Sequence, residues 1–283
     1  GIKIPIGPRA FLRNYLLKIG KASWGKTMSS NARVVIYSPY APEKPGAAGM
    51  RVHSMKEAFH AAGWDAIILT PADGEGTRLA QRVYQWHPSI VMATSPPLPP
   101  LGWVWLGAKM AGAKFVLDAK DDGRAISILA REKRSLKEKA YVALRQHLYT
   151  GADMNWFLTP SDRNEGVLRY SLSSKKTMLV PNGVDPRMVW RSNEDEKVRR
   201  AVRRENKVAP GTRVILYAGS MGDEDVSGLV EKGLSSISSA VIFWVIAMDN
   251  THEEEVRLED FKKKLTEKNL MKHSRIFINI PIE

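Results

Sequence analysis

The chain has 283 residues, of which 43% are apolar, so it is long enough to form one or two domains with sizeable cores and is not disordered by composition. It has no cysteine, which excludes disulfides and thiolate metal sites, and its longest stretch of low charge, residues 88–108, contains five prolines and does not predict a transmembrane helix. The net charge of +13 lies entirely in residues 1–182, which indicates either a polyanionic partner (nucleic acid, an anionic membrane or a phosphorylated substrate) or a solubilising surface.

Residues 1–31 are predicted to form an N-terminal extension with a basic amphipathic helix. Apolar residues recur there at helical spacing, from Phe11 to Ile19, among lysines and arginines. Such a helix either lies on an anionic membrane surface or packs its apolar face on the domain, and the residues favour neither. No secretory signal is evident, and together with the absence of cysteine this favours a cytoplasmic protein.

Residues 32–185 show strands alternating with helices, which predicts a doubly wound, Rossmann-like α/β domain with a parallel sheet. The predicted strands are Arg33–Ser38, Asp65–Thr70, Ser89–Thr94, Lys114–Asp118, Met154–Leu158 and Thr177–Val180. The predicted helices are Met50–Ala62, Leu98–Ala111, one from about Ala130 to Leu148, and one capped at Ser161.

Residues 186–210 are strongly charged and predict a linker with a solvated helix, and residues 211–283 predict a second, partial domain of the same kind. Its predicted elements are the strands Val214–Ala218, Val241–Ala247 and Ile276–Ile280 and the helices Val226–Ile237 and Glu253–Asn269. Three β units are about half of a Rossmann-type domain, whose usual size is about 100–150 residues. A sheet that stops at its third strand has an unprotected edge, so we expect the second domain to be incomplete in this chain.

Ligands of parallel α/β sheets bind at the carboxyl ends of the strands, which makes the loops there the candidate site. After the first strand, Gly46 and Gly49 would let the backbone approach a diphosphate or sugar, and Arg51 would add a positive charge to the helix N-terminus. In the second half, Gly219, Ser220 and Gly222 are the candidates for a phosphate cradle. The alternative is that these glycines only shape surface turns.

The third and fourth strands end in polar residues that would face an acceptor. Ser95 offers a hydroxyl, and Asp118 and Asp121 offer carboxylates. Asp121 would accept hydrogen bonds from sugar hydroxyls or take a proton from an acceptor, and the alternative is that it caps the next helix. A metal site is conceivable, but no second carboxylate cluster supports one, so none is predicted.

Five segments in the same order resemble family 4 glycosyltransferases, especially those that build surface polysaccharides. They include VPNGVD at residues 180–185 and VILYAGSMG at residues 214–222, and the others span residues 34–70, 93–121 and 151–168. The resemblance implies a GT-B fold, in which two Rossmann-like domains face each other. It also implies a hexosyltransferase-type reaction, in which a sugar passes from a nucleotide-sugar to a lipid-linked or glycan acceptor with retention, without a metal or cofactor.

The resemblance also implies roles for the candidate residues. It places Gly46 to Gly49 near the sugar and diphosphate, Asp121 in the cleft near the acceptor, and Gly219 to Gly222 near the nucleotide. The basic acceptor domain would face the anionic cytoplasmic leaflet as a peripheral membrane protein.

The chain departs from the family pattern in three places. The acids Asp223–Asp225 stand where the family has a basic residue, Ala247–Asn250 replace a glycine-containing strand end, and the family's pair of donor-binding glutamates would lie beyond residue 283. A non-catalytic binding or scaffold protein that has lost the donor site is therefore the alternative. Nucleic-acid binding is disfavoured, because Trp86, Trp103 and Trp105 are not interleaved with basic residues.

Overall fold

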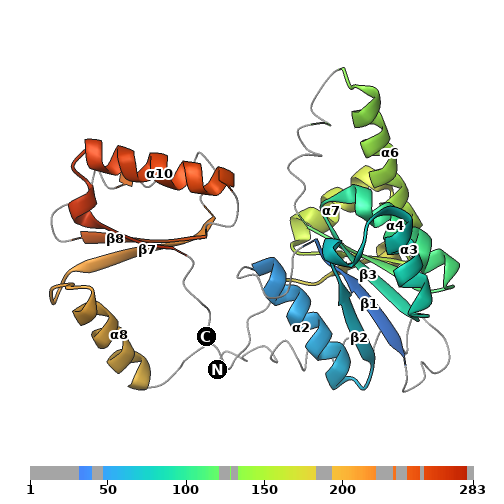
Figure 1. Cartoon of the computed structure of the whole chain (residues 1–283), viewed down its shortest axis with the longest axis horizontal. Helices are drawn as coiled ribbons and strands as arrows, with labels where there is room; N and C mark the ends of the chain where they lie inside the picture. Colours follow the sequence, from blue (N-terminus) through green and yellow to red (C-terminus); the bar gives the residue numbers. More distant parts are fainter. Residues whose placement is uncertain are drawn as a thin grey trace. The chain divides into compact units, whose positions relative to one another are not determined.

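A computed structural model describes residues 32–39, 47–120, 128, 133–182, 193–220, 232–233, 241–248 and 252–278. The chain divides into two compact units, Gly1–Pro186 and Arg187–Glu283 (Figure 1). None of the described helices is long and apolar enough to cross a lipid bilayer.

The first unit contains a six-stranded parallel sheet in the order β2-β1-β3-β4-β5-β6. The strands are β1 (Arg33–Tyr37), β2 (Asp65–Leu69), β3 (Ile90–Ser95), β4 (Lys114–Ala119), β5 (Met154–Phe157) and β6 (Thr177–Leu179). All six strands lie within one or two residues of the ranges predicted from the sequence. They could be predicted because runs such as RVVIY are apolar on both faces, as buried parallel strands require.

Helices cover both faces of this sheet, so the unit is doubly wound (Figure 1). They are α2 (Ala47–Ala61), α3 (Gly76–Gln85), α4 (Leu98–Met110), α6 (Leu136–Gly151) and α7 (Pro160–Tyr170). Alternate strand residues point to opposite faces. Val35 and Tyr37 of β1 belong to an apolar cluster with residues of α3, α4 and α6, whereas Val34 and Ile36 belong to a second cluster with residues of α2.

The structure corrects the start of three predicted helices. The helix predicted from Met50 begins at Ala47, so Gly49 lies inside its first turn and not in the loop before it. The helix predicted from about Ala130 begins at Leu136, because Ser135 and Glu138 form a reciprocal capping box. The helix predicted to be capped at Ser161 begins at Pro160 and is capped by Thr159, whose hydroxyl accepts a hydrogen bond of 3.1 Å from the Asp162 amide.

Helix α3 was missed by the sequence analysis. It presents only Leu79, Ala80 and Val83 to the core, a short apolar stripe among polar residues. It packs closely against α4, since a Cβ on Gly107 would lie 2.5 Å from the Ala80 carbonyl oxygen.

The second unit contains a three-stranded parallel sheet in the order β7-β8-β9. Its described elements are α8 (Asn193–Glu205), β7 (Arg213–Ser220), β8 (Val241–Met248), α10 (His252–Glu267) and β9 (Ser274–Ile278). Val245 of β8 and three residues of α10, Leu258, Phe261 and Leu265, form its buried apolar cluster. The predicted helix Val226–Ile237 lies, except for residues 232–233, outside the described residues.

Candidate functional site

The candidate site lies at the carboxyl edge of the six-stranded sheet, where the strand order changes direction. From β1 the chain passes to β2 on one side, while β3 lies on the other side of β1. In open α/β sheets ligands bind in the crevice outside such a switch point. The chain that follows β1 leads into α2, so the first turn of α2 and the end of β3 border this position.

Gly49 occupies the first turn of α2 and is buried. The N-terminal turn of a helix has backbone N–H groups without partners inside the helix and carries a partial positive charge. Such a turn can donate hydrogen bonds to an anionic ligand, and this role of Gly49 stays a prediction. The other glycine of that prediction, Gly46, lies outside the described residues.

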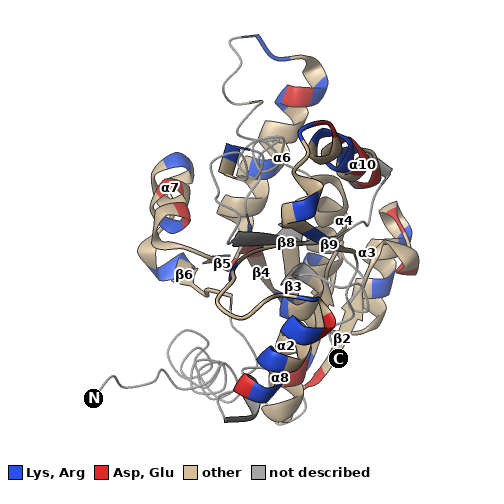
Figure 2. Ribbon diagram, turned by 90° about the vertical axis from the view of Figure 1, so that its left-hand side faces the viewer, with Lys and Arg blue, Asp and Glu red and all other residues tan. Residues whose placement is uncertain are grey.

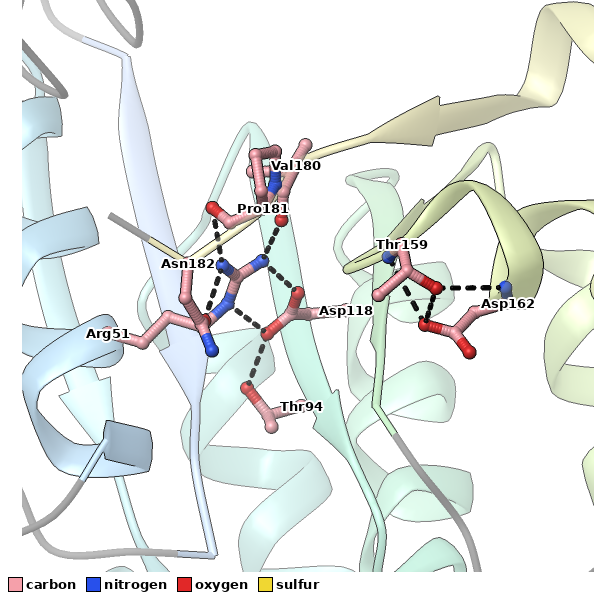
Figure 3. Close-up of polar contacts among 8 residues, drawn as sticks. All are labelled: Arg51, Thr94, Asp118, Thr159, Asp162, Val180, Pro181 and Asn182. Atoms are coloured by element: carbon pink, nitrogen blue, oxygen red, sulfur yellow. Dashed lines mark hydrogen bonds and ion pairs between the residues drawn. The ribbon is translucent and has the colours of Figure 1, made fainter. Parts of the chain in front are cut away.

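Arg51, two residues further along α2, forms a two-point ion pair with Asp118 of β4 (Figure 3). Its Nη2 lies 2.7 Å from Asp118 Oδ1 and its Nε lies 3.1 Å from Oδ2. The Asp118 side chain is 0% exposed and that of Arg51 is 6% exposed. Two opposite charges so far from solvent require each other, because either alone would be strongly destabilising.

The remaining donors of Arg51 hold the segment that follows β6 (Figure 3). Nη2 donates to the Val180 carbonyl at 3.0 Å, and Nη1 donates to the Pro181 carbonyl at 3.3 Å and to Asn182 Oδ1 at 3.2 Å. A guanidinium has five N–H donors, so every one of them has an acceptor within the protein. A phosphate could reach Arg51 only by displacing some of these contacts, and its role in donor binding stays a prediction.

Thr94 and Asp118 are direct neighbours on β3 and β4, and the Thr94 hydroxyl donates to Asp118 Oδ2 at 3.4 Å. Ser95, the next residue, pairs with Ala119, which belongs to the apolar cluster on the other face. The structure therefore places Ser95 and Asp118, both predicted to face the acceptor, on opposite faces of the sheet. Of the two hydroxyl residues at the end of this strand, the prediction chose Ser95 and not Thr94, because the face of each residue depends on the register of the sheet.

The Ser95 hydroxyl and the Tyr37 hydroxyl are buried and have no hydrogen-bond partner among the described residues. Tyr37 belongs to the same cluster as Ala119, so both hydroxyls are on the face that α3 and α4 cover. Burial, together with the negative charge of Glu75, raises the pKa of Tyr37 to about 12. Both residues stand at the carboxyl ends of their strands, β1 and β3.

A hollow of about 70 Å³ opens beside the end of β4, between α6 and α7. Its lining combines three basic, two acidic and three aromatic residues with two small ones: Lys120, Arg145, Arg169, Asp162, Glu165, Tyr149, Phe157, Tyr170, Ala119 and Gly166. Burial lowers the pKa of Lys120; the Asp118 carboxylate opposes this effect and the Arg51 guanidinium adds to it. This lining suits a small polar group. The hollow could not be predicted from the sequence, because its lining residues come from four separate elements.

Arg145 forms one wall of this hollow. Its guanidinium lies 5.4 Å from the ring centre of Tyr149 and 5.6 Å from that of Tyr170. The two rings stack on each other, with centroids 4.3 Å apart. A guanidinium over two aromatic rings is attracted by both, so this side chain is held in place.

The remaining predicted residues divide into described and undescribed ones. Gly219 and Ser220, predicted to follow the strand Val214–Ala218, are the last two residues of β7 and pair with Ala247 and Met248 of β8. Their role as a phosphate cradle stays a prediction. Gly222, Asp121 and the acids Asp223–Asp225 lie outside the described residues. Among the described residues, no group of three or more His, Cys, Asp or Glu side chains is placed to hold a metal ion.

Neither a protein-family model nor a curated protein matches the sequence. In fold, the chain is similar to HepE of Anabaena, solved in complex with UDP and glucose, with a TM-score of 0.59 and 13% identity over 89% of this chain and 70% of that one. It is also similar to the catalytic domain of starch synthase IV of Arabidopsis thaliana, bound to ADP and acarbose, with a TM-score of 0.57 and 11% identity over 89% and 75% of the two chains.

A third similar structure is the UDP-forming α,α-trehalose-phosphate synthase of Burkholderia vietnamiensis, with a TM-score of 0.56 and 12% identity over 89% of this chain and 72% of the other. These three structures are GT-B glycosyltransferases. Identities of 11–13% show the fold alone. The predicted fold class is confirmed, and the chain has an α/β fold of the GT-B type.

Proposed function

We propose that this chain is a glycosyltransferase that moves a sugar from a nucleotide-sugar to a lipid-linked or glycan acceptor. The observation that carries the proposal is the position of glycines at the carboxyl edge of each sheet. Gly49 lies in the first turn of α2, and Gly219 ends β7 beside Ser220, in a fold shared with glycosyltransferases. HepE, the similar protein from Anabaena, was solved with UDP-glucose, which supports a nucleotide-diphosphate sugar as the donor.

In the proposed reaction the acceptor oxygen forms a bond to the anomeric carbon, and the bond from that carbon to the nucleotide diphosphate breaks with retention. Asp121 takes the acceptor proton, and backbone N–H groups near Gly49 stabilise the departing diphosphate. Most of the rate acceleration then comes from holding the two substrates in position. The transfer is of the hexosyltransferase type, needs no metal or cofactor, and takes place at the cytoplasmic side of the membrane.

The first test is the melting temperature of the whole chain with UDP, ADP and GDP and with their glucose conjugates. A ligand at 100 times its Kd stabilises the folded state by about 2.7 kcal/mol, which raises the melting temperature by about 5–10 °C. A rise with one nucleotide class and its sugar supports the proposal and identifies the donor. A flat response to all of them contradicts it and favours the non-catalytic scaffold, which would keep the fold without a donor site.

Two variants separate the proposed roles. Gly49→Ala should lose the shift with the nucleotide-sugar, because a side chain would crowd the backbone beside the helix N-terminus. Gly49 is buried, so the variant must first be shown to fold and its own melting temperature without ligand is the reference for the shift. Asp121→Asn should keep that shift and lose the release of nucleotide diphosphate in the presence of acceptor lipids or glycans. If Asp121→Asn keeps its turnover, Asp121 is not the base.

A further inference from the structure

The N-terminal end of α6 carries a cluster of positive charges. It consists of Lys133 and Arg134, just before the helix, and Lys137 and Lys139 in its first turn, and we call these four residues with Leu136 the α6 tip. This end of α6 extends past the neighbouring helices α4 and α7 (Figure 1). Figure 2 shows Lys and Arg at the same end of the helix.

The lysines of the α6 tip are exposed to solvent, and so is the leucine among them. Lys133, Lys137 and Lys139 are exposed. Leu136 is 83% exposed, and among the large apolar side chains of the described residues only Leu168 is exposed to the same degree. The acid within this segment, Glu138, accepts hydrogen bonds from the Ser135 amide at 2.8 Å and from its hydroxyl at 3.0 Å. Glu138 is thus held by the helix cap.

The positive charges of the α6 tip do not help the helix to fold. The N-terminus of a helix carries a partial positive charge, so lysines and arginines are favoured at the other end. Cations close to one another also repel. Leu136 gains nothing from the fold either, because it is almost fully exposed. Both features become favourable only when an anionic and partly apolar partner covers them.

An anionic bilayer fits this pair of features better than a soluble anion or a nucleic acid. Lysines on a protein surface are attracted by the negative potential of anionic lipids, and an exposed leucine beside them can enter the boundary between headgroups and acyl chains. A nucleic acid would be expected to find an aromatic side chain for stacking, whereas the α6 tip offers a leucine.

We propose that the α6 tip docks the protein on an anionic membrane surface. The lysines contact lipid headgroups while Leu136 inserts between them. This inference rests on the membrane location in the proposed function and names the surface that binds there. It is tested separately from the transferase activity, because membrane binding is measured without any substrate. If the chain binds vesicles but no nucleotide, the docking surface is supported and the proposed transferase activity is contradicted. If it binds nucleotide but no vesicles, the transferase activity is supported and the docking surface is contradicted.

The absence of cysteine allows a direct test with the full-length chain. Leu136→Cys is labelled with a polarity-sensitive dye and mixed with vesicles of phosphatidylcholine and phosphatidylglycerol. The matched control is Leu168→Cys on α7, a residue with the same 83% exposure. We expect a blue shift of the emission at position 136 that salt reverses, with no shift at position 168 and none with pure phosphatidylcholine. Equal shifts at both positions, or none at either, overturn the proposal.

Vesicle co-sedimentation tests the charges. One variant replaces three lysines of the α6 tip by glutamine: Lys133, Lys137 and Lys139. The control variant makes the same replacements at three exposed lysines near the end of α10: Lys263, Lys264 and Lys268. Each lysine near an anionic surface contributes a factor of about five to binding, so we expect the first variant to lose about 100-fold and the control to lose much less.

Two results of this experiment would overturn the proposal. Unchanged binding of the α6-tip variant would mean that another segment, such as residues 1–31, binds the vesicles. An equal loss in both variants would mean that only the total charge matters. Melting curves of both variants must match that of the unmodified chain, since all six lysines are exposed.

Discussion

The Arg51 guanidinium and the Asp118 carboxylate form a buried, two-point ion pair, with atoms 2.7 and 3.1 Å apart, although the residues are separated by 67 positions in the sequence. The same guanidinium binds Val180, Pro181 and Asn182, the last described residues before the chain passes to the second unit. One side chain therefore joins α2, β4 and the segment after β6 at the carboxyl edge of the sheet. This edge is where the proposed substrates bind, so the ion pair supports the shape of the site.

Arg51→Gln and Asp118→Asn are each expected to lower the free energy of unfolding of the first unit by about 3–5 kcal/mol, because each leaves one buried charge unpaired. The double variant should lose less than the sum of the two, since no unpaired charge then remains. Urea denaturation followed by circular dichroism measures all three.

The half-exposed pair of Lys114 and Asp153 is the control for this measurement. Lys114 Nζ and Asp153 Oδ1 are similarly close, 2.8 Å apart, but 52% of the Lys114 side chain is exposed. Lys114→Gln should cost less than about 1 kcal/mol. If Arg51→Gln costs no more than that, the Arg51 pair does not support the fold.

Two glycines on α4 should respond in opposite directions to the same change. In Gly107→Ala the new Cβ would lie 2.5 Å from the Ala80 carbonyl oxygen and 2.8 Å from Val83 Cβ, so α3 would be pushed away. We expect a loss of about 1–3 kcal/mol. In Gly102→Ala the new Cβ meets Leu144 at 3.4 Å, and better helix propensity should stabilise the protein by up to about 1 kcal/mol. Thermal unfolding compares them, and similar values for both would argue against the close packing of α3 on α4.

The cap of α7 can be identified by replacing Thr159 and Ser161, one at a time, with alanine. Thr159→Ala removes the oxygen that accepts a hydrogen bond from the Asp162 amide, and should cost about 1 kcal/mol. Ser161→Ala should cost close to nothing, because Ser161 is exposed inside the first turn. Chemical denaturation of the two variants decides between the cap in the structure and the one that the sequence suggested.

Tyr37 should make stability depend on pH between about 10 and 12. Its pKa is raised from 10.0 to about 12 in the folded protein, so in this range the unfolded chain loses the phenol proton while the folded protein keeps it. The unfolded state is then favoured, and the free energy of unfolding should fall with rising pH, by about 2–3 kcal/mol in all.

Tyr37→Phe removes this contribution and leaves stability below pH 10 nearly unchanged, because the Tyr37 hydroxyl has no partner among the described residues. The measurement is the difference in unfolding free energy between the two proteins at several pH values. A difference that stays constant from pH 9 to 12 would contradict the raised pKa.

The strands, and with them the class of the fold, could be predicted from the sequence because they depend on local patterns. An apolar run such as Arg33–Tyr37, bounded by glycine- and proline-rich loops, specifies a buried strand wherever it occurs. Gly49 and Gly219 were chosen in the same way, Gly49 from the glycine-containing stretch between the first strand and its helix and Gly219 from the end of a strand. The uneven charge of the two halves is likewise a property of composition.

Contacts between distant segments were decided only by the tertiary structure. The sequence suggested Arg51 as a partner for phosphate, and only the order of the strands shows that it meets Asp118 and, 131 positions away, Asn182. The sequence also assigned Ser95 and Asp118 to the same acceptor side, whereas the register of β3 against β4 pairs Asp118 with Thr94 and Ser95 with Ala119. Neighbouring strand residues point to opposite faces, so a pairing is settled by sheet order and register, which no local pattern of residues contains.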